Sequence, residues 1–111
     1  MERISRLTPA ARALLAYSPL SYMLDAVCEN PSLAEAWVDD AARPARCALL
    51  LGRYLFLSRG ADEPFLAAFK GLALPPERRG GLIVFYEGAA AAEAAAKALG
   101  GAFRRVRSLY R

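Results

Sequence analysis

Three segments are apolar almost throughout, and they constrain the fold of this chain more than any other feature: Arg46–Leu51, Tyr54–Ser58 and Gly81–Tyr86. A strand with one solvated face alternates apolar and polar residues, whereas a strand covered on both faces does not. These segments do not alternate, so we expect strands with helices packed on each side. Gly52-Arg53 separates the first two segments, and glycine at the first central position fits a two-residue type II′ hairpin turn.

The remaining segments predict four helices and two further strands. Thr8-Pro9 and Ser18-Pro19 each place a hydroxyl cap before a proline, which is the usual start of a helix. The helices are expected at 10–17, from Ser18 onward, at 65–72 and at 88–99, and the further strands at 33–39 and 103–110. This order, ααβββαβαβ, predicts an α/β (α+β) fold with a mixed, largely antiparallel sheet and helices on both faces. A chain of 111 residues without a linker-like segment is expected to form a single domain, 1–111.

Residue usage excludes several kinds of chemistry. The chain has no histidine and two cysteines, Cys28 and Cys47, which removes histidine acid–base catalysis and the common zinc sites. Both cysteines are expected to be buried as small apolar residues. Asp39-Asp40 is a carboxylate pair, but no further ligand stands at a suitable spacing, so a solvated turn and no metal are expected. The chain has no apolar run long enough to span a membrane, and charges interrupt its N-terminus where a signal peptide is apolar. A cytoplasmic location is therefore expected.

The formal net charge of +4 is concentrated at the C-terminus, where no acid accompanies Arg104, Arg105, Arg107 and Arg111. With aromatic residues between them, these arginines could hold a nucleic-acid backbone through charge and stacking. They could equally protect an edge strand from aggregation or contact a partner domain. We favour the edge strand or the partner contact, because no second basic element supports nucleic-acid binding.

The segment Ser58–Pro64 joins a predicted strand to the helix expected at 65–72. A turn in this position can hold a phosphate on backbone N–H groups at the helix N-terminus, provided that glycines let several amides converge. Here one glycine, Gly60, is followed by Asp62 and Glu63. Their charges stabilise the helix itself and repel a phosphate, and Pro64 has no N–H to donate.

A loose pattern of strand and turn residues runs through the chain: Val38-Asp39-Asp40, Pro44, Ala48-Leu49, Phe56-Leu57, Gly60 and Phe65. Together with the element order, this pattern resembles the amino-terminal domain of a bacterial family of GNAT N-acetyltransferases, in which a degenerate, non-catalytic domain precedes the catalytic one. The resemblance covers about residues 18–111. It implies a GNAT-like sheet without its first and last strands.

The resemblance implies an acetyl-CoA enzyme only where the family's pyrophosphate loop, Gln/Arg-x-x-Gly-x-Gly/Ala, is present. Arg59 and Gly60 are the candidate cofactor-binding residues, since Arg59 aligns with the first position, but the glycine spacing fails. Arg78-Arg79-Gly80-Gly81 also has the wrong spacing and precedes a strand instead of a helix. We therefore expect no cofactor and carry over no catalytic residue.

Three functional hypotheses follow. The first is a non-catalytic GNAT-like domain that forms a homodimer or packs on a companion catalytic domain, because the unpaired edges of an incomplete sheet seek partners. The second is an acyl-CoA-dependent N-acetyltransferase, whole or truncated, that uses acetyl-CoA. Glu87 as general base and Tyr86 as acid is one interpretation of this pair, but we favour an aromatic residue at a strand end followed by a carboxylate at a helix N-terminus. The third is a nucleic-acid-binding module that uses Arg104, Arg105 and Arg107.

Overall fold

The computed structural model describes all of the chain except residues 16–20, 53, 75–81, 87–88, 100–102 and 109–111. Six strands form one sheet in the spatial order β1-β2-β3-β4-β5-β6. They are β1 (Glu2–Ile4), β2 (Glu35–Val38), β3 (Cys47–Leu51), β4 (Tyr54–Leu57), β5 (Leu82–Tyr86) and β6 (Phe103–Ser108). The pairs from β1 to β4 are antiparallel, and the pairs β4–β5 and β5–β6 are parallel. The predicted mixed, largely antiparallel sheet is confirmed.

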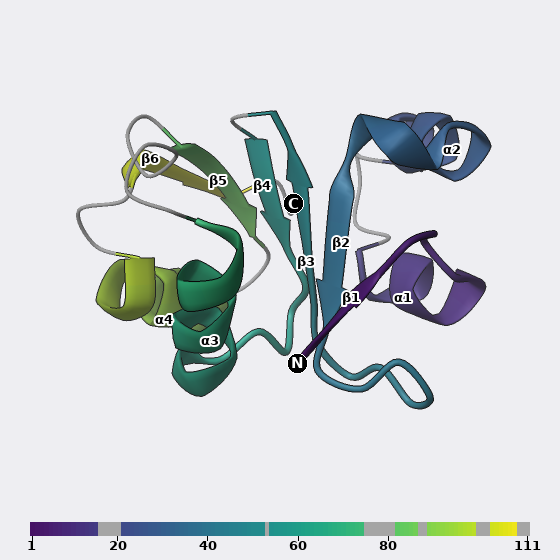
Figure 1. Ribbon diagram of the computed structural model, residues 1–111. Helices are drawn as coiled ribbons and strands as arrows, with labels where there is room; N and C mark the ends of the chain where they lie inside the picture. The colour runs from purple at the N-terminus through teal and green to yellow at the C-terminus, as the bar shows by residue number, and fades with distance from the viewer. Residues whose placement is uncertain (16–20, 53, 75–81, 87–88, 100–102, 109–111) are drawn as a thin grey trace.

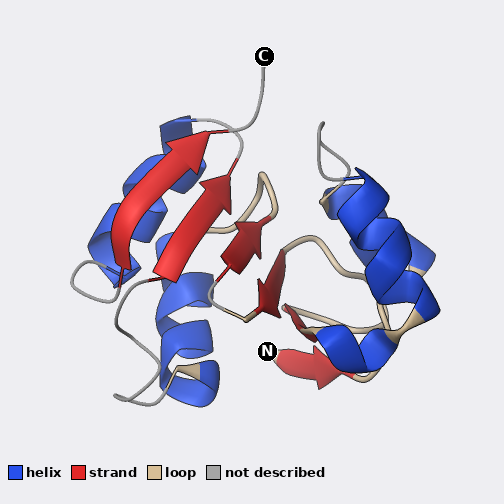
Figure 2. Ribbon diagram, turned by 90° about the horizontal axis from the view of Figure 1, so that it is seen from above, coloured by secondary structure: helices blue, strands red, loops and turns tan. Residues whose placement is uncertain are grey.

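The helices lie in two pairs on opposite faces of this sheet, as Figures 1 and 2 show. One face carries α1 (Pro9–Leu14) and α2 (Ser21–Glu29), and the other carries α3 (Glu63–Ala73) and α4 (Ala89–Leu99). Helix α1 begins as expected, because the Thr8 hydroxyl accepts a hydrogen bond from the N–H of Ala11 at 3.2 Å. The described helices include none with the length and apolar character of a membrane span.

Each face of the sheet has its own hydrophobic core. The α3–α4 core includes Leu50, Leu55, Leu66, Phe69 and Val84. The α1–α2 core includes Ala11, Leu24, Val38, Leu49 and Phe56. Burying a valine, leucine or phenylalanine side chain stabilises the fold by about 1.5–3 kcal/mol, so both layers of helices contribute strongly.

Successive residues of β3 and β4 alternate between the two cores. Leu49 pairs with Phe56 and both enter the α1–α2 core, whereas Leu50 pairs with Leu55 in the α3–α4 core. This arrangement confirms the cover on both faces for β3 and for Leu55–Leu57 of β4. On β5 the expectation was wrong for one face, because Val84 is buried while Ile83 and Phe85 are only half-buried. The hairpin between the two strands turns at Gly52, whose φ of +62° is the positive value that the first central position of a type II′ turn requires.

The predicted element order lacked one strand. Strand β1 precedes α1 and pairs with β2, so the order is βααβββαβαβ and the expectation of a missing first strand was wrong. The strand was missed because it has three residues, of which Glu2 and Arg3 are exposed, and an edge strand needs no apolar run. The strand expected at 33–39 is also shorter, since a 3₁₀ turn, Pro31–Leu33, occupies its start.

Candidate functional site

The turn between β4 and α3 is the position that sequence reasoning singled out, and it is built from internal hydrogen bonds. Ser58 is fully buried; its N–H donates to the carbonyl of Cys47, and its hydroxyl accepts from the N–H of Cys47, both at 2.9 Å. The Ser58 carbonyl in turn accepts from the N–H of Ala61 at 3.1 Å. The turn therefore extends the β3–β4 pairing and places Asp62 at the start of α3.

Gly60 allows a close approach between this turn and the segment before β3. A Cβ atom placed on Gly60 would lie 3.0 Å from the carbonyl oxygen of Ala45. That separation is shorter than ordinary van der Waals contact, and a backbone oxygen cannot move aside cheaply. Gly60 thus has a packing role in the turn, and its neighbour Arg59 lies exposed on the outside.

The N-terminus of α3 already holds an anionic group of the chain itself. Asp62 is the N-cap, and its Oδ1 accepts a hydrogen bond from the N–H of Phe65 at 3.1 Å. The N–H of Leu66 donates to the Asp62 carbonyl at 3.0 Å, and Pro64 has no N–H. The Asp62 carboxylate therefore occupies the place where a phosphate would bind at a helix N-terminus.

Arg46 links Asp62 to Asp39, and we call these three residues the Asp39–Arg46–Asp62 network. Nη1 of Arg46 donates to Oδ2 of Asp39 at 3.1 Å. Its Nε lies 3.1 Å from Oδ2 of Asp62, at ion-pair distance but without hydrogen-bond alignment. The network lines a hollow of about 330 Å³. Two carboxylates and one guanidinium make that hollow unfavourable for a diphosphate.

Asp39 is the centre of the network. Its Oδ1 accepts hydrogen bonds from the backbone N–H groups of Asp40 at 3.0 Å, Ala45 at 3.0 Å and Arg46 at 3.1 Å. Burial by itself raises the pKa of Asp39, but these three bonds and the Arg46 guanidinium outweigh it and hold the pKa below its ordinary value. Asp39 thus holds the backbone of the β2–β3 turn. Among the described residues, no three histidine, cysteine, aspartate or glutamate side chains lie together as a metal site would require.

Three of the C-terminal arginines, Arg104, Arg105 and Arg107, lie on β6, an edge of the described sheet. The backbone of Arg105 pairs with Ile83 and that of Arg107 with Phe85, and the register shifts between Leu82 and Ile83. Arg104 falls at this shift, and Arg111 lies outside the described residues. The predicted arginine-rich strand is therefore present, and its backbone forms an edge of the described sheet.

An aromatic row, Tyr54, Phe56 and Phe85, lies beside that edge and was missed by sequence reasoning. The rings of Phe56 and Phe85 stack with centroids 4.9 Å apart, and those of Tyr54 and Phe85 lie 5.9 Å apart. Phe56 is buried, Phe85 is half-buried and Tyr54 is 40% exposed. The row faces away from α3 and α4. Its signal in the sequence was the spacing of two between Tyr54 and Phe56, which places both on one face.

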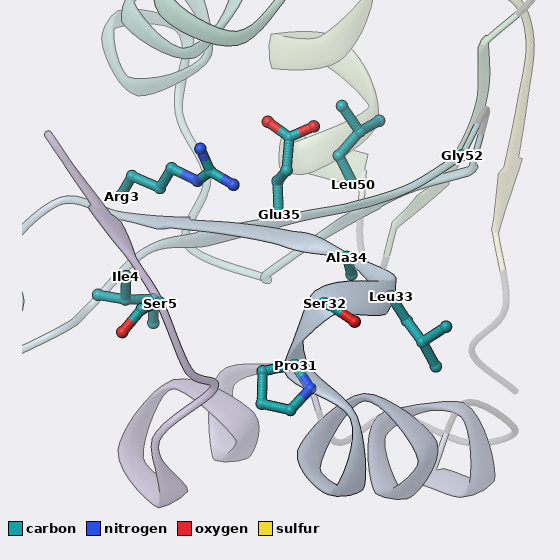
Figure 3. Close-up of a pocket in the computed structure, with 10 residues that line it drawn as sticks. All are labelled: Arg3, Ile4, Ser5, Pro31, Ser32, Leu33, Ala34, Glu35, Leu50 and Gly52. Carbon is teal, nitrogen blue, oxygen red and sulfur yellow. The ribbon is translucent and has the colours of Figure 1, made fainter.

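A larger hollow of about 740 Å³ opens at the other end of the sheet, where β1 ends and β2 begins (Figure 3). Arg3, Glu35 and Leu50 lie on one side of the strands, and Pro31 and Leu33 lie on the other. The remaining lining residues are Ile4, Ser5, Ser32, Ala34 and Gly52. The charged side chains of Arg3 and Glu35 therefore lie on one side of the strands, and the hollow does not bring them together with the hydroxyl groups of Ser5 and Ser32.

The other candidate residues are placed as follows. Tyr86 is half-buried and packs against the α3–α4 core, and Glu87, its proposed acid–base partner, lies outside the described residues. Cys47 is buried in β3, and burial raises the pKa of its thiol to about 12. Cys28 is only half-buried, which corrects the expectation of a buried thiol. It packs against the α1–α2 core, and its Sγ lies 4.0 Å from the carbonyl oxygen of Leu7.

Comparison of the chain with protein-family models, with curated proteins and with solved structures found no match. A proposal about the function of this chain therefore rests on its own geometry.

Proposed function

We propose that this chain is a GNAT-like, non-catalytic domain that acts by association through the aromatic face of β4 and β5. The hydrogen bonds and ion pairs of the β4–α3 turn are the main support for a non-catalytic role. The N–H of Phe65 already donates to the Asp62 carboxylate, and Arg46 is engaged by Asp39 and Asp62. A diphosphate would have to displace one carboxylate and overcome the repulsion of another, which favours association over acyl transfer.

The association surface consists of Tyr54, Ile83 and Phe85. Tyr54 is 40% exposed, and Ile83 and Phe85 are half-buried, although these residues lie on adjacent central strands. Burying such an apolar surface against a partner lowers the free energy, because each aromatic side chain removes a large area from water at a small entropic cost. The neighbouring strand β6 is an edge of the described sheet, so its backbone can pair with a further strand. A second copy of the chain is the occupant that we propose.

Analytical ultracentrifugation of the whole chain over a range of concentrations tests the association. We expect a reversible dimer that Tyr54→Asp weakens by at least about tenfold, because a charge at the centre of an apolar interface is poorly solvated. The matched control is Leu72→Asp, because Leu72 is 59% exposed on α3, away from this face. A chain that stays monomeric at every concentration contradicts self-association. A dimer that loses equal affinity in both variants contradicts the proposed surface.

Calorimetry with acetyl-CoA tests the non-catalytic part separately. The chain is expected to give no binding heat, because Asp62 occupies the helix N-terminus. Micromolar binding would overturn this part and favour the acyl-CoA-dependent N-acetyltransferase, whether or not the chain dimerises.

A further inference from the structure

A second hollow, of about 530 Å³, lies between α1 and α2 on the side of the molecule away from the β4–α3 turn. Its walls come from the segment before α1, from α1 and from α2. Five of its lining residues are apolar or weakly polar: Leu7, Pro9, Ala13, Leu24 and Cys28. Leu7 and Leu24 also belong to the α1–α2 core, so the floor of the hollow is a rigid part of the fold.

The other two described lining residues are arginines, and none of the described lining residues is a carboxylate. Arg6 is exposed at the rim, and Arg12 is half-buried. Arg12 pairs through Nη2 with Asp25 on α2, and both side chains of this pair are partly exposed. A guanidinium has five N–H donors, so a single ion pair leaves donors that can bind a second carboxylate. The hollow thus combines an apolar floor with a cationic rim.

We propose that this hollow binds a single-chain amphiphile with an anionic carboxylate head, such as a medium-chain fatty acid. The tail lies on Leu7, Pro9 and Leu24, and the head pairs with the guanidinium groups of Arg6 and Arg12. The volume is within the range of small-molecule sites, about 300–1,000 Å³. Charge complementarity selects the head group, because a guanidinium and a carboxylate form paired hydrogen bonds that neutral and cationic heads cannot form.

Calorimetry with octanoate, decanoate and dodecanoate, at concentrations below micelle formation, tests the tail. Each buried methylene contributes about 0.8 kcal/mol, which corresponds to an increase in affinity of up to about fourfold. Dodecan-1-ol and dodecyltrimethylammonium carry the same tail and test the head group. We expect both to bind at least about tenfold more weakly than dodecanoate. Equal affinity for the three head groups, or no dependence on tail length, overturns the proposal.

The two cysteines provide an independent measurement. Cys28 lines the hollow and is half-buried, whereas Cys47 is buried in β3 and serves as an unreactive reference in the same molecule. Without a ligand, iodoacetamide is expected to modify Cys28 and spare Cys47. Dodecanoate at ten times its dissociation constant is expected to slow the modification of Cys28 about tenfold, since the free fraction falls by that factor. A Cys28 that reacts as slowly as Cys47 in the free protein, or that dodecanoate does not protect, contradicts an open site here.

Substitutions at two alanines of α1 locate the site without disturbing a core. Ala13 and Ala10 are both exposed on α1, but only Ala13 lines the hollow. Ala13→Glu places a carboxylate beside the guanidinium groups and is expected to weaken dodecanoate binding at least about tenfold, with Ala13→Gln intermediate. Ala10→Glu is the control and is expected to change the affinity by less than about twofold. Circular dichroism verifies that each variant keeps its helices. Equal effects of Ala13→Glu and Ala10→Glu overturn the assignment.

Discussion

Replacing Asp39 with alanine is expected to destabilise the fold strongly, because its carboxylate accepts several backbone hydrogen bonds of the β2–β3 turn. The substitution removes three backbone hydrogen bonds and the ion pair with Arg46. Hydrogen bonds to a charged group contribute about 1.5–3 kcal/mol each when they are well buried. The Asp39 side chain is 23% exposed and Asp40 and Ala45 are exposed, so water replaces part of the loss. We expect a net decrease of about 2–3 kcal/mol in the free energy of unfolding.

Urea denaturation followed by circular dichroism measures this change, and a matched variant isolates its cause. Asp40→Ala removes a neighbouring carboxylate that accepts one exposed hydrogen bond, from the N–H of Ala42 at 2.9 Å. This control is expected to lower the stability by less than about 0.5 kcal/mol. If Asp39→Ala costs no more than Asp40→Ala, the hydrogen bonds of Asp39 do not hold the turn and the reasoning is refuted.

The same carboxylate makes the effect dependent on pH. The pKa of Asp39 is lower in the folded chain than its ordinary value of about 3.9, so the folded state favours the charged form. Its contribution is complete above the ordinary pKa and disappears as the pH falls through the lower, folded-state pKa. The stability difference between the wild type and Asp39→Ala should therefore be constant near pH 7 and shrink at pH values below about 4. A difference that grows on acidification contradicts this sign.

Two further substitutions test the β4–α3 turn. Gly60→Ala is expected to lower the stability by about 1–3 kcal/mol, because the new Cβ lies 3.0 Å from the Ala45 carbonyl oxygen. Gly71→Ala in α3 meets no atom within 4 Å and should stabilise the helix by about 0.5–1 kcal/mol, so equal effects at the two glycines would contradict the close approach. Ser58→Ala leaves the N–H of Cys47 without its buried acceptor, and thermal denaturation should show a loss of about 1–3 kcal/mol. An unchanged melting temperature would show that this hydroxyl is replaceable.

Local patterns in the sequence were sufficient for most of the fold. The apolar segments at β3 and β4 predicted strands buried on both faces, because neighbours such as Leu49 and Leu50 point to opposite faces. For β5 the prediction of a strand was right, but one of its faces is only half-buried. The cap at Thr8 and the glycine at Gly52 marked a helix start and a turn, since each satisfies a local backbone requirement. Strand β1 lacked such a pattern, because two of its three residues are exposed.

The candidate site was predictable only in part. The carboxylate cap of α3 at Asp62 followed from the sequence, since capping and the missing N–H of Pro64 are properties of adjacent residues. The role of Arg46 was not visible, because its two partners Asp39 and Asp62 stand on either side of the β3–β4 hairpin. An ion pair has no sequence period that could reveal it.

The amino-acid sequence by itself determined most of the strands, the start of α1 and the carboxylate cap of α3, because these depend on residues within one or two turns of chain. Only the tertiary structure decided which distant side chains meet. It stacked Phe56 on Phe85, joined Asp39 to Arg46 and Asp62, and opened the hollow beside Cys28. Such contacts depend on how strands pair and on where helices dock, and many chain paths are compatible with the same local patterns.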